Sequence, residues 1–244
     1  MVKMSFLDLF MSCLAGFFKQ GVRFREVIKH LDLLGYRSLN IILVCVSFAA
    51  AVTILEASYH MKLVLHNDSL VPGFASMLIV RELAVVVMAL LLAAKIGAGM
   101  AAEVGHMKIS EQIEALRLLG IDPVNFLVLP RFIACLIGGL LLGLISNTVC
   151  LVTAVLVTIY SLDQSLGFFL MSFRRFVLFQ DLAFSLIKGM LFCGVIPLLS
   201  CYFGFICEPG ANGVGRATTK SVVSSSICII VLDFILTFTF SFFY

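Results

Sequence analysis

Charged side chains within apolar stretches are the residues of this sequence that could do chemistry. A charge at the centre of a membrane helix costs at least about 2.5–3.5 kcal/mol, so such residues usually serve function or form specific pairs. Eight candidates occur, some well inside apolar runs and some near their ends: Glu56, Lys95, Lys188 and Asp233, and Arg81, Glu82, Glu103 and Asp181. They are the predicted substrate path or intramembrane ion pairs.

Asp233 is the candidate placed deepest in an apolar run. Eleven residues follow it, which as a helix measure about 16 Å and place it near mid-membrane. A carboxylate there needs a cationic partner or a proton. We therefore predict that Asp233 pairs with Lys95 or Lys188.

These charges allow three interpretations. They could form buried pairs that fix helix register, line a substrate path, or relay protons in a secondary transporter that uses Glu56, Lys188 and Asp233. A passive membrane scaffold would instead tolerate their neutralisation. Glu56 and His60 share one helix face, but the sequence offers no further ligand near them, so no metal site is predicted.

The chain carries no recognisable catalytic motif. The nucleophile elbow G-x-S-x-G, the metalloprotease motif H-E-x-x-H and the P-loop G-x-x-x-x-G-K-[ST] are all missing from its 244 residues. We expect no catalytic residues, and if ATP drives the protein, another subunit must bind it.

The composition indicates an all-α membrane protein. Only 13% of residues are charged, where soluble domains have about 25%, and the mean hydropathy is +1.14. Five runs reach or approach the length of about 20 residues that spans a bilayer: 39–55, 83–102, 132–160, 182–207 and 222–244. We predict one domain over 1–244, with an interfacial region at 1–38 and a transmembrane bundle at 39–244.

The distribution of charge predicts the orientation. Of 17 Lys and Arg residues, twelve fall in segments 1–38, 95–131 and 208–220, four fall in the outer segments, and Lys188 lies within a predicted span. Positive residues favour the cytoplasmic side, so the N-terminus is predicted there. Five spans then place the C-terminus outside.

Residues 4–34 have the pattern of a helix lying at the membrane interface. Apolar residues recur there at helical spacing, followed by basic ones: Phe6, Leu9, Phe10, Leu14, Phe17 and Phe18. In the second apolar run, small residues recur every fourth position and predict close helix packing: Ala93, Gly97, Ala101 and Gly105. The pattern does not say whether the neighbouring helix belongs to the same chain.

The polar stretch KISEQIEALRLLGIDPVN, residues 108–125, is typical of a helix outside the bilayer. Its apolar stripe is Ile109, Ile113, Leu116 and Leu119, and its polar faces carry Ser110, Glu111, Glu114 and Arg117. Gly120 is placed as a helix stop, and Asp122–Pro123 as the start of the next helix. The helix could transmit movement from a soluble partner or rest on lipid headgroups. If a partner docks, Leu116 and Leu119 would anchor it, and Glu111, Glu114 and Arg117 would orient it.

Two blocks resemble the MlaE (YrbE) family of ABC-transporter permeases. Residues 81–132, RELAVVVMALLLAAKIGAGMAAEVGHMKISEQIEALRLLGIDPVNFLVLPRF, follow the family's R-E-L-G-P…A-E-[IL]-G-x-M-x-x-x-E-Q…D-P…P-R-F pattern. Residues 213–237, GVGRATTKSVVSSSICIIVLDFILT, follow its G-x-x-R-A-T…D-x-x-L-T ending. The blocks cover about a third of the chain.

The resemblance implies a homodimeric permease that moves phospholipid or related lipid between bacterial membranes. Implied partners are a cytosolic P-loop ATPase dimer carrying ATP and Mg, a periplasmic MCE-domain protein and often a STAS-domain protein. It further implies the inner membrane, an interfacial N-terminal helix before five spans, and a cytoplasmic coupling helix between spans 2 and 3.

The sequence departs from the family pattern at three places. Ala84–Val85 replace Gly-Pro, so the helix break expected there is absent. Lys95 replaces Arg, which keeps the charge but loses the bidentate fork. Glu56 replaces a frequent Gln and adds an acid to the first span.

Overall fold

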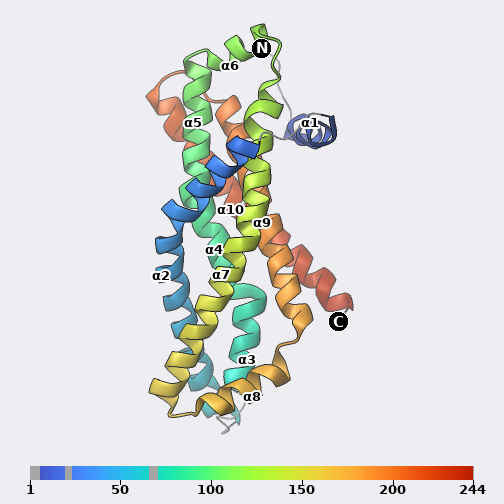
Figure 1. Cartoon of the computed structure of the whole chain (residues 1–244). Coiled ribbons are helices and arrows are strands. Elements are labelled where there is room, and N and C mark those ends of the chain that lie inside the picture. The colour runs from blue at the N-terminus through green and yellow to red at the C-terminus, as the bar shows by residue number, and fades with distance from the viewer. Residues whose placement is uncertain (1–5, 20–23, 66–70, 244) are drawn as a thin grey trace. The chain divides into compact units, whose positions relative to one another are not determined.

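The protein is an assembly of helices in the computed structural model, which describes residues 6–19, 24–65 and 71–243 (Figure 1). The α-helices are α1 (Phe6–Lys19), α2 (Phe24–Leu65), α3 (Val71–Leu78), α4 (Ala84–Leu92), α5 (Ala98–Ile109), α6 (Gln112–Leu118), α7 (Leu129–Leu162), α8 (Leu166–Phe176), α9 (Phe179–Phe205) and α10 (Ala211–Phe243). Among the described residues, three π-helical turns join some of them: η2 (Ile79–Leu83), η3 (Ala93–Gly97) and η4 (Val124–Val128).

Five helical segments within the described residues are long and apolar enough to cross a membrane. They are Ser38–Met61, Val71–Ile109, Val124–Ser161, Phe179–Phe205 and Ala211–Phe242. Helices suit this role because they satisfy their backbone hydrogen bonds internally. The prediction of an all-α membrane protein with five spans is confirmed. The second span is longer than predicted: its 39 residues measure about 58 Å, against about 30 Å of hydrocarbon.

The N-terminal region differs from the prediction. The prediction of an interfacial helix over residues 4–34 is wrong for residues 24–34, because these belong to α2, which continues into the first span without a break. In α1, Leu9 and Cys13 are buried, and Phe6 meets the ring of Tyr202 edge-on at 5.8 Å. The side chains of Leu14, Phe17 and Phe18 lie outside the described residues. Figure 1 shows α1 nearly end-on, whereas α5 is upright.

The chain divides into two compact units, each built from separate stretches of sequence. Unit 1 comprises residues 1–38, 90–139 and 190–244, and unit 2 comprises 39–89 and 140–189. Neither unit is a continuous segment, because the long helices contribute one part to each. The predicted organisation as a single permease domain stays a prediction.

Unit 1 is packed through the small residues of the second span. Ala93, Gly97, Ala101 and Gly105 are all buried. A side chain added at Gly97 would lie 3.1 Å from the Ser200 hydroxyl, and one at Gly204 would lie 2.7 Å from Val104. The small residues therefore let the second span approach α9 of the same chain, which answers the question that the sequence left open.

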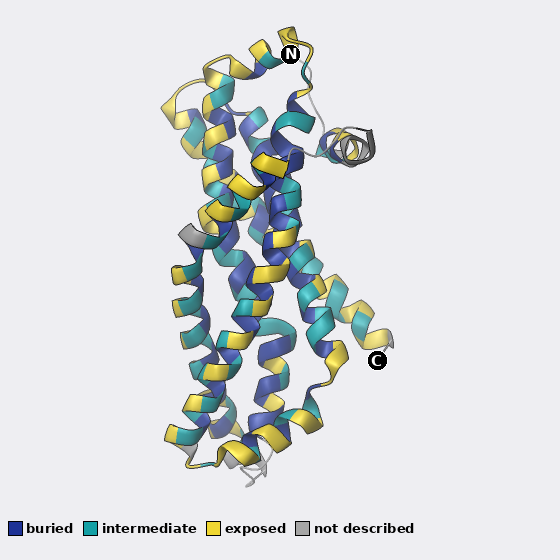
Figure 2. Ribbon diagram, in the orientation of Figure 1, coloured by how far each residue is buried: buried dark blue, intermediate teal, exposed yellow. Residues whose placement is uncertain are grey.

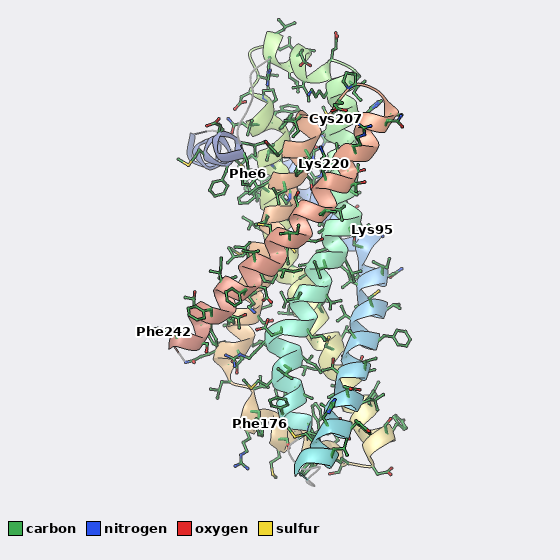
Figure 3. All side chains as sticks on the ribbon, turned by 180° about the vertical axis from the view of Figure 1, so that it is seen from behind. Phe6, Lys95, Phe176, Cys207, Lys220 and Phe242 are labelled. Carbon is green, nitrogen blue, oxygen red and sulfur yellow. The ribbon has the colours of Figure 1, made fainter. Side chains whose placement is uncertain are left out.

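Unit 2 contains a helix that the sequence analysis missed. Helix α8 is short and amphipathic, and the hydroxyl of Ser165 accepts a hydrogen bond from the Phe168 amide at its start. Phe169 and Ser172 are buried, and α8 lies against α3, where Gly73 leaves room for the ring of Phe176. Figure 3 shows Phe176 at this contact.

Candidate transport site and coupling helix

Three charged residues of the second span lie in π-helical turns. Arg81 and Glu82 belong to η2, and Lys95 belongs to η3. A π-turn adds one residue to a helix, which rotates the following side chains, and such turns are frequent at functional sites. Helix α4 follows η2 directly at Ala84, so the predicted absence of a break at Ala84–Val85 is confirmed.

Two ion pairs join η2 to α9 inside unit 2. The Arg81 Nε atom lies 3.2 Å from Asp181 Oδ1, and the Lys188 Nζ atom lies 2.7 Å from Glu82 Oε2. Asp181 and Lys188 are completely buried, whereas Glu82 is one-third exposed. Lys188 also donates to the Arg81 carbonyl at 3.4 Å and lies 5.1 Å from the centre of the Phe184 ring. We call Arg81, Glu82, Asp181 and Lys188 the charge cluster.

The charge cluster is neutral, which is what an apolar surrounding requires. The completely buried Asp181 and Lys188 each have a partly exposed partner of opposite sign, so neither buried charge is left uncompensated. Asp181 has a second role at the beginning of α9, where its Oδ2 atom accepts a hydrogen bond of 2.9 Å from the Leu178 amide. One buried carboxylate therefore fixes both an arginine of η2 and a helix terminus.

The structure thus brings together four of the eight predicted charges. Glu56 pairs with His60 at 3.0 Å, and Glu103 pairs with Arg131 at 2.9 Å. Asp233 belongs to unit 1, and its pairing with Lys95 or Lys188 stays a prediction. Within the described residues, no three His, Cys, Asp or Glu side chains are grouped so that they could hold a metal ion.

An apolar groove of about 570 Å³ lies between α2 and α3 of unit 2. Its lining is mostly apolar and includes Val52, Ala57, Phe74 and Leu78, together with the Glu56–His60 pair. We call it the outer groove. Such a lining is suited to a hydrocarbon chain, because burial of apolar surface is favourable and makes no directional demand.

Helix α6 is shorter than the helix predicted over residues 109–119. Ile109 is the last residue of α5, and Ser110 and Glu111 form a turn in which Glu111 has a φ of 60°. The prediction of one continuous apolar stripe is wrong at Ile109, because the chain changes direction between that residue and Ile113.

Both helix boundaries predicted after α6 are confirmed. The Gly120 amide donates to the Arg117 carbonyl and the Ile121 amide to the Leu116 carbonyl, the two bonds of a Schellman stop, and Gly120 has a φ of 73°. Asp122 then caps the next helix, since its Oδ1 atom accepts a hydrogen bond of 3.2 Å from the Val124 amide.

The faces of α6 have distinct surroundings. Ile113 is buried in a core with Leu9 and Val128, and Leu116 packs against the same core. Glu111, Glu114 and Arg117 are exposed. Leu118 is 89% exposed and Leu119 is 74% exposed. Leu118 was missed because it lies off the stripe that helical periodicity selects.

Five apolar spans, a neutral charge cluster and an exposed helix between two spans are features of a multi-pass membrane protein. The family model "Permease MlaE" matches residues 27–239, and the chain belongs to that family. It is an ABC-transporter permease, a transport subunit that works with an ATPase.

Two bacterial relatives of the chain carry corresponding names, and a plant relative carries a different one. A probable ABC transporter permease protein of Rickettsia bellii is 33% identical over 93% of this chain and 87% of its own length. A probable ABC transporter permease protein of Synechocystis is 30% identical, over 87% of this chain and 80% of its own. The chloroplastic protein TRIGALACTOSYLDIACYLGLYCEROL 1 of Arabidopsis thaliana is 32% identical, over 89% of this chain and 62% of its own length.

Proposed function

We propose that this permease moves phospholipid or a related lipid between bacterial membranes, driven by a separate cytosolic P-loop ATPase dimer that binds ATP and Mg. The main support for a lipid substrate is the outer groove, whose mostly apolar lining suits an acyl chain. The Arabidopsis relative, which bears the name of a galactolipid, supports the same substrate class.

The proposed orientation follows from the basic residues. With twelve of the 17 Lys and Arg on the side of the N-terminus, that terminus is cytoplasmic and the C-terminus is periplasmic, in the bacterial inner membrane. In this orientation α6 faces the ATPase, and the outer groove lies toward the periplasm. A periplasmic MCE-domain protein would then accept or deliver lipid, and a STAS-domain protein could join the cytosolic side.

A second copy of the chain is the proposed neighbour of α10. Only 11% of this span's most apolar window is buried, compared with 50% for α9, as the yellow and teal of α10 in Figure 2 illustrate. Its exposed apolar residues include Phe234 and Phe238, whose rings stack at 6.2 Å. A homodimer in contact through α10 would bury part of this surface, and lipid would cover the rest.

In this proposal α6 is the coupling helix. Ile113 and Leu116 fasten it to the core of unit 1, so a push on α6 reaches the membrane helices. Leu118 and Leu119 present an apolar end to the ATPase, and the charges of Glu111, Glu114 and Arg117 set the orientation of docking.

Reconstitution separates ATP-driven transport from proton-coupled transport. Vesicles would contain the permease with its ATPase and a fluorescent phospholipid, whose movement to an acceptor is followed over time. We expect transfer that requires ATP hydrolysis and stops when the ATPase carries a substitution that permits ATP binding but not hydrolysis. Transfer driven by a pH gradient in vesicles that hold the permease alone would overturn the proposal.

A further inference from the structure

A second groove, of about 390 Å³, lies within unit 1 between the beginning of α2 and the helix that runs from η3 into α5. His30 and Leu33 line it from α2, and Lys95, Ile96, Met100 and Glu103 from the other side. We call it the inner groove. Lys95, labelled in Figure 3, marks one end of this wall.

Two charged side chains line the inner groove, Lys95 and Glu103, and they lie at different depths along the helix. Glu103 lies eight residues after Lys95, a rise of about 12 Å along the helix. Helix α5 continues from Glu103 to the turn before α6, so in the proposed orientation Glu103 is nearer the cytoplasm and Lys95 is deeper in the bilayer. Apart from His30, the side chains that line the groove between them are apolar, and at Gly99 no atom outside the backbone of its own helix lies within 4 Å of where a side chain would begin.

An ion pair with Arg131 fixes the position of the Glu103 carboxylate. Its Oε2 atom lies 2.9 Å from Nη2 of Arg131, a residue that is only 3% exposed. Arg131 is itself fixed, because its Nη1 atom donates a hydrogen bond of 2.8 Å to the Leu127 carbonyl. The Glu103 side chain remains more than half exposed, so the carboxylate can accept hydrogen bonds from a second cation.

The order of these charges matches one class of lipid headgroup. In a phospholipid of the cytoplasmic leaflet, the phosphate lies deeper in the membrane than the headgroup alcohol, such as ethanolamine or glycerol, that is attached to it. Lys95 is a phosphate-binding residue type at the deeper position, and Glu103 is an acceptor for an ammonium at the shallower one. A phospholipid with a terminal glycerol in place of the amine offers Glu103 no cation.

We infer that the inner groove binds an ethanolamine phospholipid of the cytoplasmic leaflet, with its phosphate at Lys95 and its ammonium at Glu103. This inference rests on the proposed orientation and names a headgroup for the proposed lipid substrate. One acyl chain lies along Leu33, Ile96 and Met100.

Fluorescence quenching tests the inference, because the chain has no tryptophan. A Leu33→Trp variant of the full-length permease would be reconstituted without ATPase in vesicles of an unbrominated phospholipid mixture. A fixed fraction of one lipid is then brominated near the top of one acyl chain. An Ile41→Trp variant is the control, since this exposed residue of α2 lies outside the inner groove.

In the Leu33→Trp variant, we expect brominated ethanolamine lipid to be enriched about two- to five-fold over brominated glycerol lipid, the range for one exposed charged pair. No headgroup preference is expected in the Ile41→Trp control. Added to Leu33→Trp, Lys95→Gln should reduce binding of both lipids, Lys95→Arg should restore it, and Glu103→Gln should abolish the preference. Choline lipid, which has the charge but no N–H donor, should bind less than ethanolamine lipid, a comparison that needs no change to Glu103.

Equal quenching of the Leu33→Trp variant by ethanolamine and glycerol lipids, or binding unaffected by Lys95→Gln, would overturn the inference. The assay contains no ATPase, so this outcome leaves ATP-driven transport to its own test. Conversely, headgroup-selective quenching without ATP-driven transport would refute the proposed function and support the inner groove.

Discussion

Different interactions stabilise the interior of each of the two units of this permease. Unit 2 contains the charge cluster, in which Asp181 and Lys188 are completely buried. Unit 1 is packed through small residues and an apolar core, and its ion pairs reach the surface, as for Arg216 and Glu208, which are both more than 70% exposed. Buried pairs give position at a high cost of desolvation, whereas small residues give close contact at little cost.

We interpret the two units as serving different functions. Unit 1 carries α6, so we interpret it as the part that receives movement from the ATPase. Unit 2 carries the outer groove. Rigid packing within this unit would keep the two walls of the groove, α2 and α3, at a fixed distance from each other. The charge cluster fixes η2, which follows α3 directly, to the beginning of α9.

The largest effect is expected from breaking one buried pair. Arg81→Gln removes the cation beside the completely buried Asp181 and should destabilise the protein by about 3–5 kcal/mol. The double variant Arg81→Gln with Asp181→Asn should be more stable than Arg81→Gln, because no unpaired carboxylate remains. Unfolding in detergent measures both. The matched control is Arg216→Gln, on the exposed pair, with an expected loss of at most about 1 kcal/mol. If the loss in the double variant equals the sum of the losses measured for Arg81→Gln alone and for Asp181→Asn alone, the pair is not coupled.

A smaller effect is expected from filling the helix contact of unit 1. Gly204→Ala places a methyl group 2.7 Å from Val104, a stiff β-branched residue, and should cost about 1–3 kcal/mol through overpacking. Gly215→Ala is the control, because no atom outside the backbone of its own helix lies within 4 Å of the added methyl group, and a gain of about 0.5–1 kcal/mol is expected in the helix. The same unfolding measurement applies. If both variants behave alike, close packing does not hold the second span to α9.

The smallest effect concerns pH. Burial, followed by the nearby positive charge of Arg131, holds the pKa of His30 below its ordinary value of 6.5. The unfolded chain therefore takes up a proton at a higher pH than the folded chain does, and His30 reduces stability as pH falls through 6.5. We expect His30→Gln to flatten the dependence of the unfolding midpoint on pH between about 7.5 and 5.5. An unchanged pH dependence in His30→Gln would contradict this assignment.

The elements with a strong local signal could be predicted from the sequence. Five spans follow from apolar length, and Gly120 and Asp122 from the local chemistry of helix ends. The continuity of α2 was missed because its basic first part gives the same pattern as an interfacial helix. Helix α8 was missed because it is short and its buried face depends on contact with α3, which lies about 90 residues earlier.

The candidate site was predicted as a set of residues but not as pairs. Burial cost selects the charged residues from sequence, and four of them form the charge cluster. Arg81 and Asp181, however, are 100 positions apart, and one sequence contains no information on which cation meets which carboxylate. The positions of the π-turns η2 and η3 were not predicted either, because a turn of this kind has no local sequence signal and depends on packing in the folded chain.

The central claim, that an ATPase acts on the membrane helices through α6, is tested most directly by co-purification. Replacement of both Leu118 and Leu119 with Ser removes the exposed apolar end of α6 and leaves Ile113 and Leu116 on the core of unit 1. We expect the variant to insert in the membrane normally, to lose the ATPase during purification in detergent, and to lose ATP-driven lipid transfer. Ser110→Ala, an exposed change at the turn before α6, is the control and should retain the ATPase. Retention of the ATPase at wild-type stoichiometry by the Leu118→Ser, Leu119→Ser variant would contradict the claim.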